Sequence, residues 1–233
     1  MAQPAVLDTQ PYLKYLLHAS VKDTPTEDVT YGVICEFLLQ HKNPSDRFII
    51  FPQMFLRWKP DNPEDTRAEI PDFGLGNFSL HAPHIKFRLG IEVKRCINAM
   101  EALPDSLALQ SNVDIMSAFH EVFFQGEDQA KAAVKGHHFS ETGTAPWLLF
   151  IGPYWTPVQY GPFSPAQLTT RTHKPSDSAD FMATLVAEKK RASTPVVRPL
   201  YLLGTAESAM QLEQFIASTD SSVQHLRVAA AGY

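Results

Sequence analysis

Residues 69–95 read EIPDFGLGNFSLHAPHIKFRLGIEVKR, and this stretch decides the fold. Its first part is typical of a strand that carries Pro71 and Asp72, and the turn-rich insert GNFSLHAPH follows. A second strand over residues 87–93 then leads into Lys94. The pattern therefore predicts two neighbouring strands joined by a hairpin-like insert.

The end of the second strand carries two charges on one face. Ile91 and Val93 alternate with Glu92 and Lys94, so the two-residue period of a strand separates the apolar pair from the charged pair. Burial of an unpaired charge is costly, so such a pair either reaches solvent or serves a site. Hairpin pairing can bring Asp72 alongside, which would complete a cradle of oxygen ligands for Mg²⁺. The alternative is that Asp72 caps a turn and that the two charges form a solvated strand face.

Pro71–Asp72 followed by Glu92–Val93–Lys94 resembles the signature of the PD-(D/E)XK nuclease superfamily, which has the restriction-endonuclease-like fold. The resemblance implies an α/β domain whose central mixed β-sheet is flanked by helices, with the Asp72 and Glu92 strands near its middle. It also implies hydrolysis of phosphodiester bonds in DNA or RNA with Mg²⁺ or Mn²⁺. Asp72 and Glu92 would hold the metal with the Val93 carbonyl, and Lys94 would position the attacking water.

The resemblance points to two more residues. In the superfamily a first helix often supplies an acidic residue, and Glu36 is the candidate on a helix expected to begin at the N-cap Thr30. A rim glutamate at the edge of the core is the alternative for Glu36. In part of the superfamily a later helix contributes a glutamine, and Gln129 would fit, with Gln125 as the rival. Either glutamine can equally be a surface amide.

Apolar periodicity elsewhere predicts further elements. We expect a strand at 48–58 in which Pro52 marks an edge, a bulge or a bend. The resemblance implies that this strand pairs with the Asp72 strand. We expect a buried strand within 146–159, followed by an aromatic loop or a hairpin arm. The remaining expected elements are helical segments at 99–124, interrupted at 104–105, from Glu127 or Asp128 to Gly136, at 181–190 and at 207–219, and a strand at 196–203.

Composition bounds the function. The 233 residues include 20 basic and 25 acidic residues, a formal net charge of −5, which counts against tight nonspecific nucleic-acid binding without excluding a local basic groove. We expect one nuclease-like domain over 1–233, with its core at about 30–165 and a C-terminal strand and helix at 195–220. The charge favours an alternative function, a catalytically inactive binding or assembly module in which Glu92 and Lys94 form a structural ion pair.

The remaining patterns concern metal sites and location. Cys35 and Cys96 lack metal-ligand spacing and are expected to be free, buried thiols in a reducing compartment. His81 and His84 do not complete a zinc site, which needs about four ligands. The sequence shows neither a signal-peptide pattern nor a membrane-spanning apolar run, so we expect an intracellular protein of the cytoplasm or nucleus. A homodimer is left open.

Overall fold

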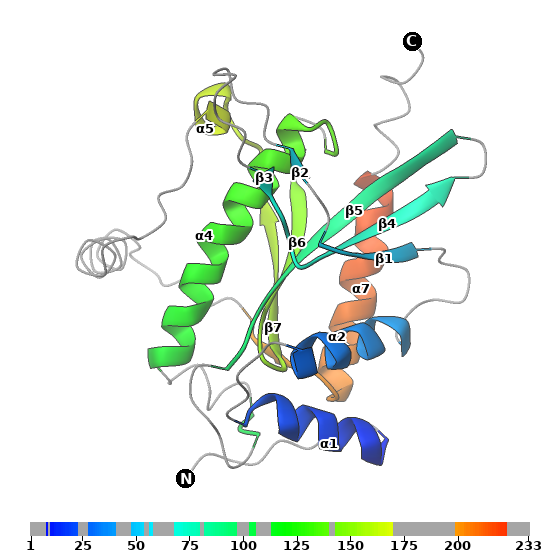
Figure 1. Cartoon of the computed structure of the whole chain (residues 1–233), viewed down its shortest axis with the longest axis vertical. Helices are drawn as coiled ribbons and strands as arrows, with labels where there is room; N and C mark the ends of the chain where they lie inside the picture. Colours follow the sequence, from blue (N-terminus) through cyan, green and yellow to red (C-terminus); the bar gives the residue numbers. More distant parts are fainter. Residues whose placement is uncertain are drawn as a thin grey trace.

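The computed structural model describes residues 8, 10–22, 28–40, 48–53, 56–57, 68–79, 82–96, 103–105, 113–139, 143–169 and 199–222. This part of the chain forms an α/β structure in which a six-stranded mixed sheet packs against helices (Figure 1). The elements in chain order are α1 (Pro11–Ser20), α2 (Asp28–Gln40), β1 (Phe48–Pro52), β2 (Leu56–Arg57), β3 (Ala68–Glu69), β4 (Phe73–Ser79), β5 (Ala82–Lys94), α4 (Val113–Lys135), β6 (Ala145–Ile151), β7 (Tyr154–Tyr160), α5 (Pro165–Thr169), β8 (Tyr201–Leu202) and α7 (Ala206–Ser222).

The strand order in the large sheet is β1-β4-β5-β6-β7-β8. Among these described strands, β5 and β6 pair in parallel, and the other neighbours pair antiparallel. A parallel pair needs a crossover connection, and α4 lies between β5 and β6 in the chain. The expected central mixed sheet is therefore confirmed, as is the pairing of residues 48–52 with the strand that follows Asp72.

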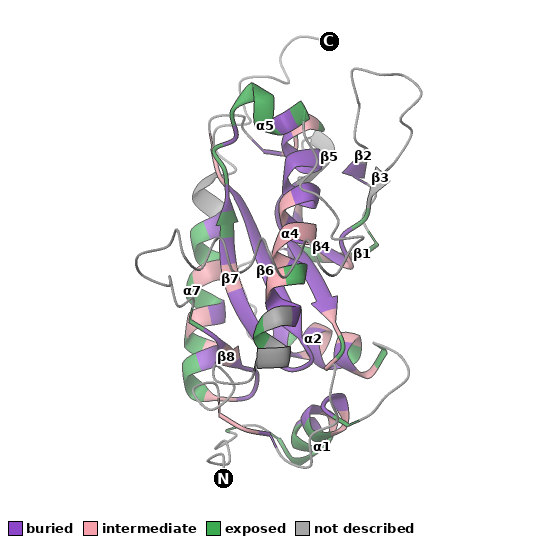
Figure 2. Ribbon diagram, turned by 90° about the vertical axis from the view of Figure 1, so that its left-hand side faces the viewer, coloured by how far each residue is buried: buried purple, intermediate pink, exposed green. Residues whose placement is uncertain are grey.

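Helices cover both faces of the sheet, as expected. In Figure 1 α4 crosses in front of the strands and α7 lies behind them. The strands between them are apolar: every residue of β6 is buried, and Figure 2 shows β6 and β7 buried along most of their length. A strand enclosed on both faces reads as a continuous apolar run, which is the pattern that predicted the buried strand within 146–159. Of the two expected continuations the hairpin arm is the one observed, because β7 pairs antiparallel with β6. The aromatic residues of this region belong to the core.

A bulge in β5 lets side chains of this strand contact helices on both faces of the sheet. The pairing of β4 with β5 shifts between Leu75 and Gly76, which leaves Arg88 as an extra residue on β5. The Arg88 guanidinium is fully buried and donates to the Ile216 carbonyl of α7 at 2.7 Å. Without the bulge, Arg88 and Glu92 would face the same side, because they are four residues apart. With it, Arg88 faces α7 and Glu92 faces α4.

Two predicted boundaries at the start of the sheet are wrong. The strand expected over 48–58 stops at Pro52, and Leu56 begins a separate two-stranded sheet with β3. Gln53 breaks the strand because its φ is 47°, a value that extended backbone does not allow. The helix expected to begin at Thr30 begins at Asp28, whose carboxylate suits the positive end of the helix dipole. Thr30 is buried within that helix.

The expected turn-rich insert is also wrong, because β4 continues to Ser79 and β5 begins at Ala82. The expectation that Pro71 and Asp72 lie within a strand is wrong as well, because these residues lie between β3 and β4, and β4 begins only at Phe73. The hairpin itself is confirmed, since β4 and β5 pair antiparallel. The two strands are therefore longer than expected and the turn between them is shorter.

The helices expected over 99–124 and from 127 or 128 onward are replaced, within the described residues, by the unbroken helix α4. Gly126 lies inside α4, where the absence of a side chain allows close packing against the sheet. A Cβ at this position would lie 2.6 Å from the Tyr160 hydroxyl of β7. That hydroxyl donates to the Phe123 carbonyl at 2.7 Å, which ties α4 to the sheet. The expected end near Gly136 is confirmed.

The C-terminal helix is confirmed as α7, in which Leu212 and Ile216 are buried and Met210 is exposed. Cys35 and Cys96 are free thiols, as expected, but both are only partly buried. Within the described ranges, no helix is long and apolar enough to cross a membrane. The helix expected at 181–190, residues 196–198 of the strand expected at 196–203, and His81 lie outside the described residues. In the described remainder of that strand, β8 is confined to Tyr201–Leu202.

Candidate functional site

Asp72 lies in the bend before β4, half-buried, and contacts three other segments of the chain. Its Oδ2 accepts a hydrogen bond from the Val93 backbone N–H at 2.7 Å, and its Oδ1 accepts one from the Tyr31 hydroxyl at 2.7 Å. Its backbone carbonyl accepts from the Gln53 N–H at 2.8 Å. The hairpin therefore places Asp72 beside the Glu92–Lys94 end of β5, and α2 helps to fix its carboxylate.

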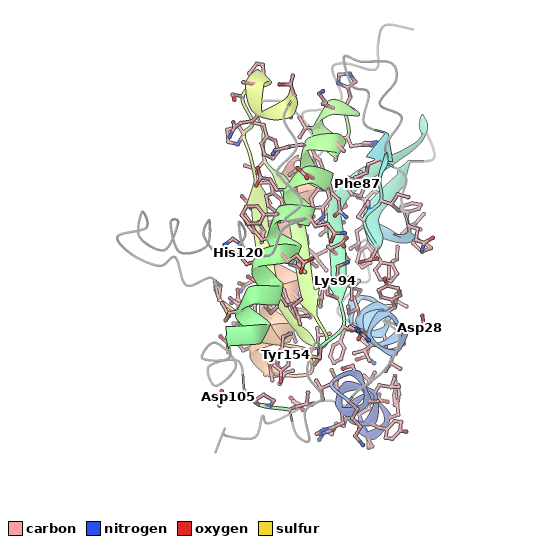
Figure 3. All side chains as sticks on the ribbon, turned by 60° about the vertical axis from the view of Figure 1, so that its left-hand side comes forward. Asp28, Phe87, Lys94, Asp105, His120 and Tyr154 are labelled. Carbon is pink, nitrogen blue, oxygen red and sulfur yellow. The ribbon has the colours of Figure 1, made fainter. Side chains whose placement is uncertain are left out.

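Glu92 and Lys94 form an ion pair on the side of β5 that faces α4. The Lys94 Nζ lies 2.7 Å from the Glu92 Oε1. The Glu92 side chain is 1% exposed, whereas the Lys94 side chain is 33% exposed. Ile91 and Val93 are fully buried, in line with the alternation expected for this stretch. In Figure 3 the labelled Phe87 and Lys94 mark the part of β5 that runs alongside α4.

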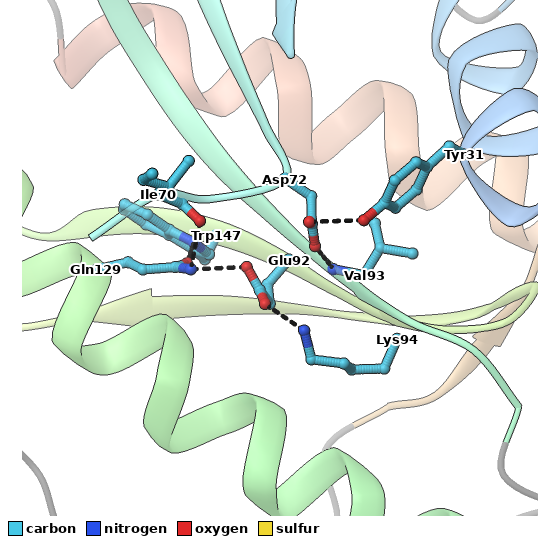
Figure 4. A network of polar contacts seen from close by, with 8 residues as sticks. All are labelled: Tyr31, Ile70, Asp72, Glu92, Val93, Lys94, Gln129 and Trp147. Carbon is cyan, nitrogen blue, oxygen red and sulfur yellow. Dashed lines mark hydrogen bonds and ion pairs between the residues drawn. The ribbon is translucent and has the colours of Figure 1, made fainter. Parts of the chain in front are cut away.

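Gln129 of α4 contacts the same carboxylate from above the sheet. Its Nε2 donates to the Glu92 Oε2 at 2.7 Å and, more weakly, to the Ile70 carbonyl at 3.4 Å. Its Oε1 accepts from the Trp147 indole N–H at 3.1 Å. Figure 4 shows these contacts together with those of Asp72 and Lys94. The structure thus brings Gln129 to the site, while the rival Gln125 lies half-buried one turn earlier on α4.

The electrostatics of the site centre on Glu92. Burial raises the pKa of the Glu92 carboxyl to about 7. The attraction of Lys94 opposes this rise, the nearby charge of Asp72 adds to it, and hydrogen bonds from Lys94 and Gln129 lower the pKa again. The nearby charges therefore do not fully offset the cost of burying the Glu92 carboxylate, so a further cation at this point would be stabilising.

Glu36 lies on α2 but outside this network. Its Oε1 accepts hydrogen bonds from the Tyr12 hydroxyl of α1 at 2.8 Å and from the Gln40 amide at 3.2 Å. The residue of α2 that reaches Asp72 is Tyr31, which is five positions earlier and therefore about 140° around the helix axis. Sequence reasoning missed Tyr31 because a tyrosine on an apolar helix carries no charge pattern that points to a site.

Replacing Tyr31 by phenylalanine is expected to lower the free energy of unfolding by about 1–2 kcal/mol, because the hydroxyl donates to a carboxylate. The edge-to-face contact between the Tyr31 and Phe73 rings, at 5.1 Å between centroids, would be kept. Urea denaturation of the two proteins measures the difference. Tyr15→Phe is the control, because Tyr15 is 73% exposed, and we expect its effect to stay within about 0.5 kcal/mol. Equal stability of the two variants would contradict the role of the Tyr31 hydroxyl.

The donor set of the site suits a hard cation. Asp72, Glu92 and the Val93 carbonyl offer only oxygen atoms, which Mg²⁺ and Mn²⁺ accept and which zinc sites seldom use alone. In the described part of the chain, no group of three or more His, Cys, Asp or Glu side chains is placed to hold a metal ion. Water would therefore have to complete the coordination, as it commonly does for Mg²⁺. The hydrogen bonds from Lys94 and Gln129 do not block a cation, since a carboxylate has about four acceptor positions.

Comparisons of the chain with protein-family models, with curated proteins and with solved structures find no match.

Proposed function

We propose that this protein is a nuclease that hydrolyses phosphodiester bonds of DNA or RNA with Mg²⁺ or Mn²⁺, built on a restriction-endonuclease-like core. The observation that carries the proposal is that Asp72 lies beside the end of β5 that carries the Glu92–Lys94 ion pair. Asp72 binds the Val93 backbone N–H at 2.7 Å, and Lys94 binds Glu92 at 2.7 Å. This grouping is what the resemblance to the PD-(D/E)XK superfamily requires.

Each residue of the site has a distinct role in this proposal. Asp72, Glu92 and the Val93 carbonyl would hold the metal, which when bound activates water and stabilises negative charge on the phosphate. Lys94 is partly exposed, so its ammonium can donate a hydrogen bond to an attacking water or to a phosphate oxygen. Gln129 orients the Glu92 carboxylate, and Tyr31 orients that of Asp72.

A second candidate function is an inactive module that binds or assembles with nucleic acid or protein. It is favoured by the way the two carboxylates are bound within the protein itself. Both oxygens of Asp72 and both oxygens of Glu92 accept hydrogen bonds from protein groups. In this alternative the Glu92–Lys94 pair is a structural ion pair inside a satisfied polar network. The formal net charge of −5 also favours it.

Calorimetry with Mn²⁺ separates the two candidates without a need to know the substrate. We expect the wild type to bind Mn²⁺, and we expect Asp72→Asn and Glu92→Gln each to weaken binding at least about tenfold, or about 1.4 kcal/mol. Both replacements keep the side-chain volume, so loss of a ligand charge is separated from loss of packing. Glu36→Gln is the matched control, because it removes one carboxylate from α2 outside the network, and it should bind as the wild type does.

A folded wild type that binds no Mn²⁺ would rule out the metal-dependent nuclease and leave the binding module. Where Mn²⁺ binds, single- and double-stranded DNA and RNA are then offered to the wild type and to the same three variants. Cleavage by the wild type and by Glu36→Gln, lost in the other two, is the expected outcome.

A further inference from the structure

The amide of Gln129 is held from both ends. An indole N–H can only donate, so Trp147 selects the amide oxygen as its partner at 3.1 Å. The Ile70 carbonyl can only accept, so it selects the amide nitrogen, at 3.4 Å. Both contacts favour the same orientation of the amide. In that orientation the Nε2 points at the Glu92 Oε2, 2.7 Å away.

We propose that Trp147 is a positioning residue of the site, which acts through Gln129 to fix the direction of the Glu92 carboxylate. Trp147 lies on β6, directly beside β5, and does not itself touch Glu92 in the network of Figure 4. The effect on metal affinity rests on the proposed function, whereas the link from Trp147 to Glu92 does not.

The indole is rigidly placed, which a positioning residue requires. Trp147 is fully buried, and rings of Phe87, Phe139 and Tyr160 surround it at centroid distances of 5.8, 6.2 and 6.2 Å. Its register partner on β5 is Gly90, and a Cβ there would lie 2.1 Å from the indole Cε2. The edge of the indole formed by Cε2, Cζ2 and Nε1 therefore occupies the space above Gly90, two residues before Glu92. Any side chain at position 90 would displace it.

Trp155 supplies a matched control for the hydrogen bond of Trp147. Its indole is also fully buried, lies on the neighbouring strand β7, and donates to the Ser208 Oγ at 2.8 Å. Trp147→Phe and Trp155→Phe each delete one buried indole N–H and a similar ring volume. Only the first removes a contact that leads to Glu92.

The first measurement is Mn²⁺ affinity. Trp147→Phe and Gln129→Leu are each expected to weaken Mn²⁺ binding about fivefold, and the double variant is expected to be no weaker than Gln129→Leu alone. Residues that act through one another give such non-additive effects, and a general loss of packing does not. Trp155→Phe should keep the wild-type affinity. An unchanged affinity in Trp147→Phe, or effects that multiply in the double variant, would overturn the proposal.

The second measurement uses the metal-free protein, so it stands if the wild type binds no Mn²⁺. The indole N–H signals in a ¹H–¹⁵N spectrum are assigned from the Trp147→Phe and Trp155→Phe variants. Glu92→Gln is expected to shift the Trp147 signal in the wild-type background but not in the Gln129→Leu background, and to leave the Trp155 signal in place. The proposal would be overturned if Glu92→Gln leaves the Trp147 signal unchanged, or if it shifts that signal equally in the Gln129→Leu background. In either case Trp147 is not linked to Glu92 through Gln129.

Discussion

Gly90→Ala is expected to lower the free energy of unfolding by about 3 kcal/mol, at the upper end of the range for overpacking a core. The added Cβ would lie 2.1 to 2.6 Å from three atoms of the Trp147 indole. The indole cannot turn aside cheaply, because it is fully buried, is enclosed by aromatic rings and is hydrogen-bonded to Gln129. Either the indole or the β5–β6 pairing must therefore move.

Urea denaturation measures this loss, with Gly32→Ala as the control. A Cβ at Gly32, on α2, would meet nothing within 4 Å, so this helical replacement is expected to stabilise the protein by about 0.5–1 kcal/mol. A second background tests the cause. In a Trp147→Leu protein the space above position 90 is open, and there Gly90→Ala should cost far less. A loss for Gly90→Ala below about 1 kcal/mol, or an equal loss in both backgrounds, would show that the indole does not occupy this space.

Glu92→Gln is expected to become more stable relative to the wild type as pH rises, by about 3 kcal/mol between pH 4.5 and about pH 8. The pKa of Glu92 rises from 4.5 to about 7 on folding, chiefly through burial. The folded wild type therefore holds this proton more tightly than the unfolded chain does. Protonation stabilises the folded state below pH 4.5, and that contribution is lost as pH rises through about 7. Glutamine does not titrate, so the variant avoids the loss.

The test is the difference in unfolding free energy between wild type and Glu92→Gln across this pH range, measured with a chelator to exclude metals. Glu207→Gln, which removes one charge from the exposed first turn of α7, corrects for the change in net charge. Lys94→Met supplies a second check. Because Lys94 lowers the pKa of Glu92, its removal should move the titration to higher pH. If the difference in unfolding free energy does not change with pH, burial does not raise the pKa of the Glu92 carboxyl, and the prediction is wrong.

The parts of this structure that the sequence predicted are those set by local periodicity. The alternation from Ile91 to Lys94 depends on the two-residue period of a strand, and the apolar run of β6 depends on burial of both its faces. Asp72 could be expected beside Glu92 because a hairpin pairs neighbouring strands. Gln129 could be proposed only through the resemblance, since nothing in its local sequence separates it from Gln125.

The rest was decided by contacts between residues far apart in the chain. A glycine inside a helix normally lowers helix stability, yet α4 continues through Gly126. A glycine is needed at this position because the Tyr160 hydroxyl occupies the space that a Cβ would take. Tyr31, rather than Glu36, meets the site because the packing of α2 on the sheet selects which side of that helix faces Asp72. Trp147 reads as a core aromatic in the sequence. Only the parallel pairing of β5 with β6, under α4, sets its indole N–H against Gln129, because hydrogen-bond partners are chosen by position in space and not by spacing along the chain.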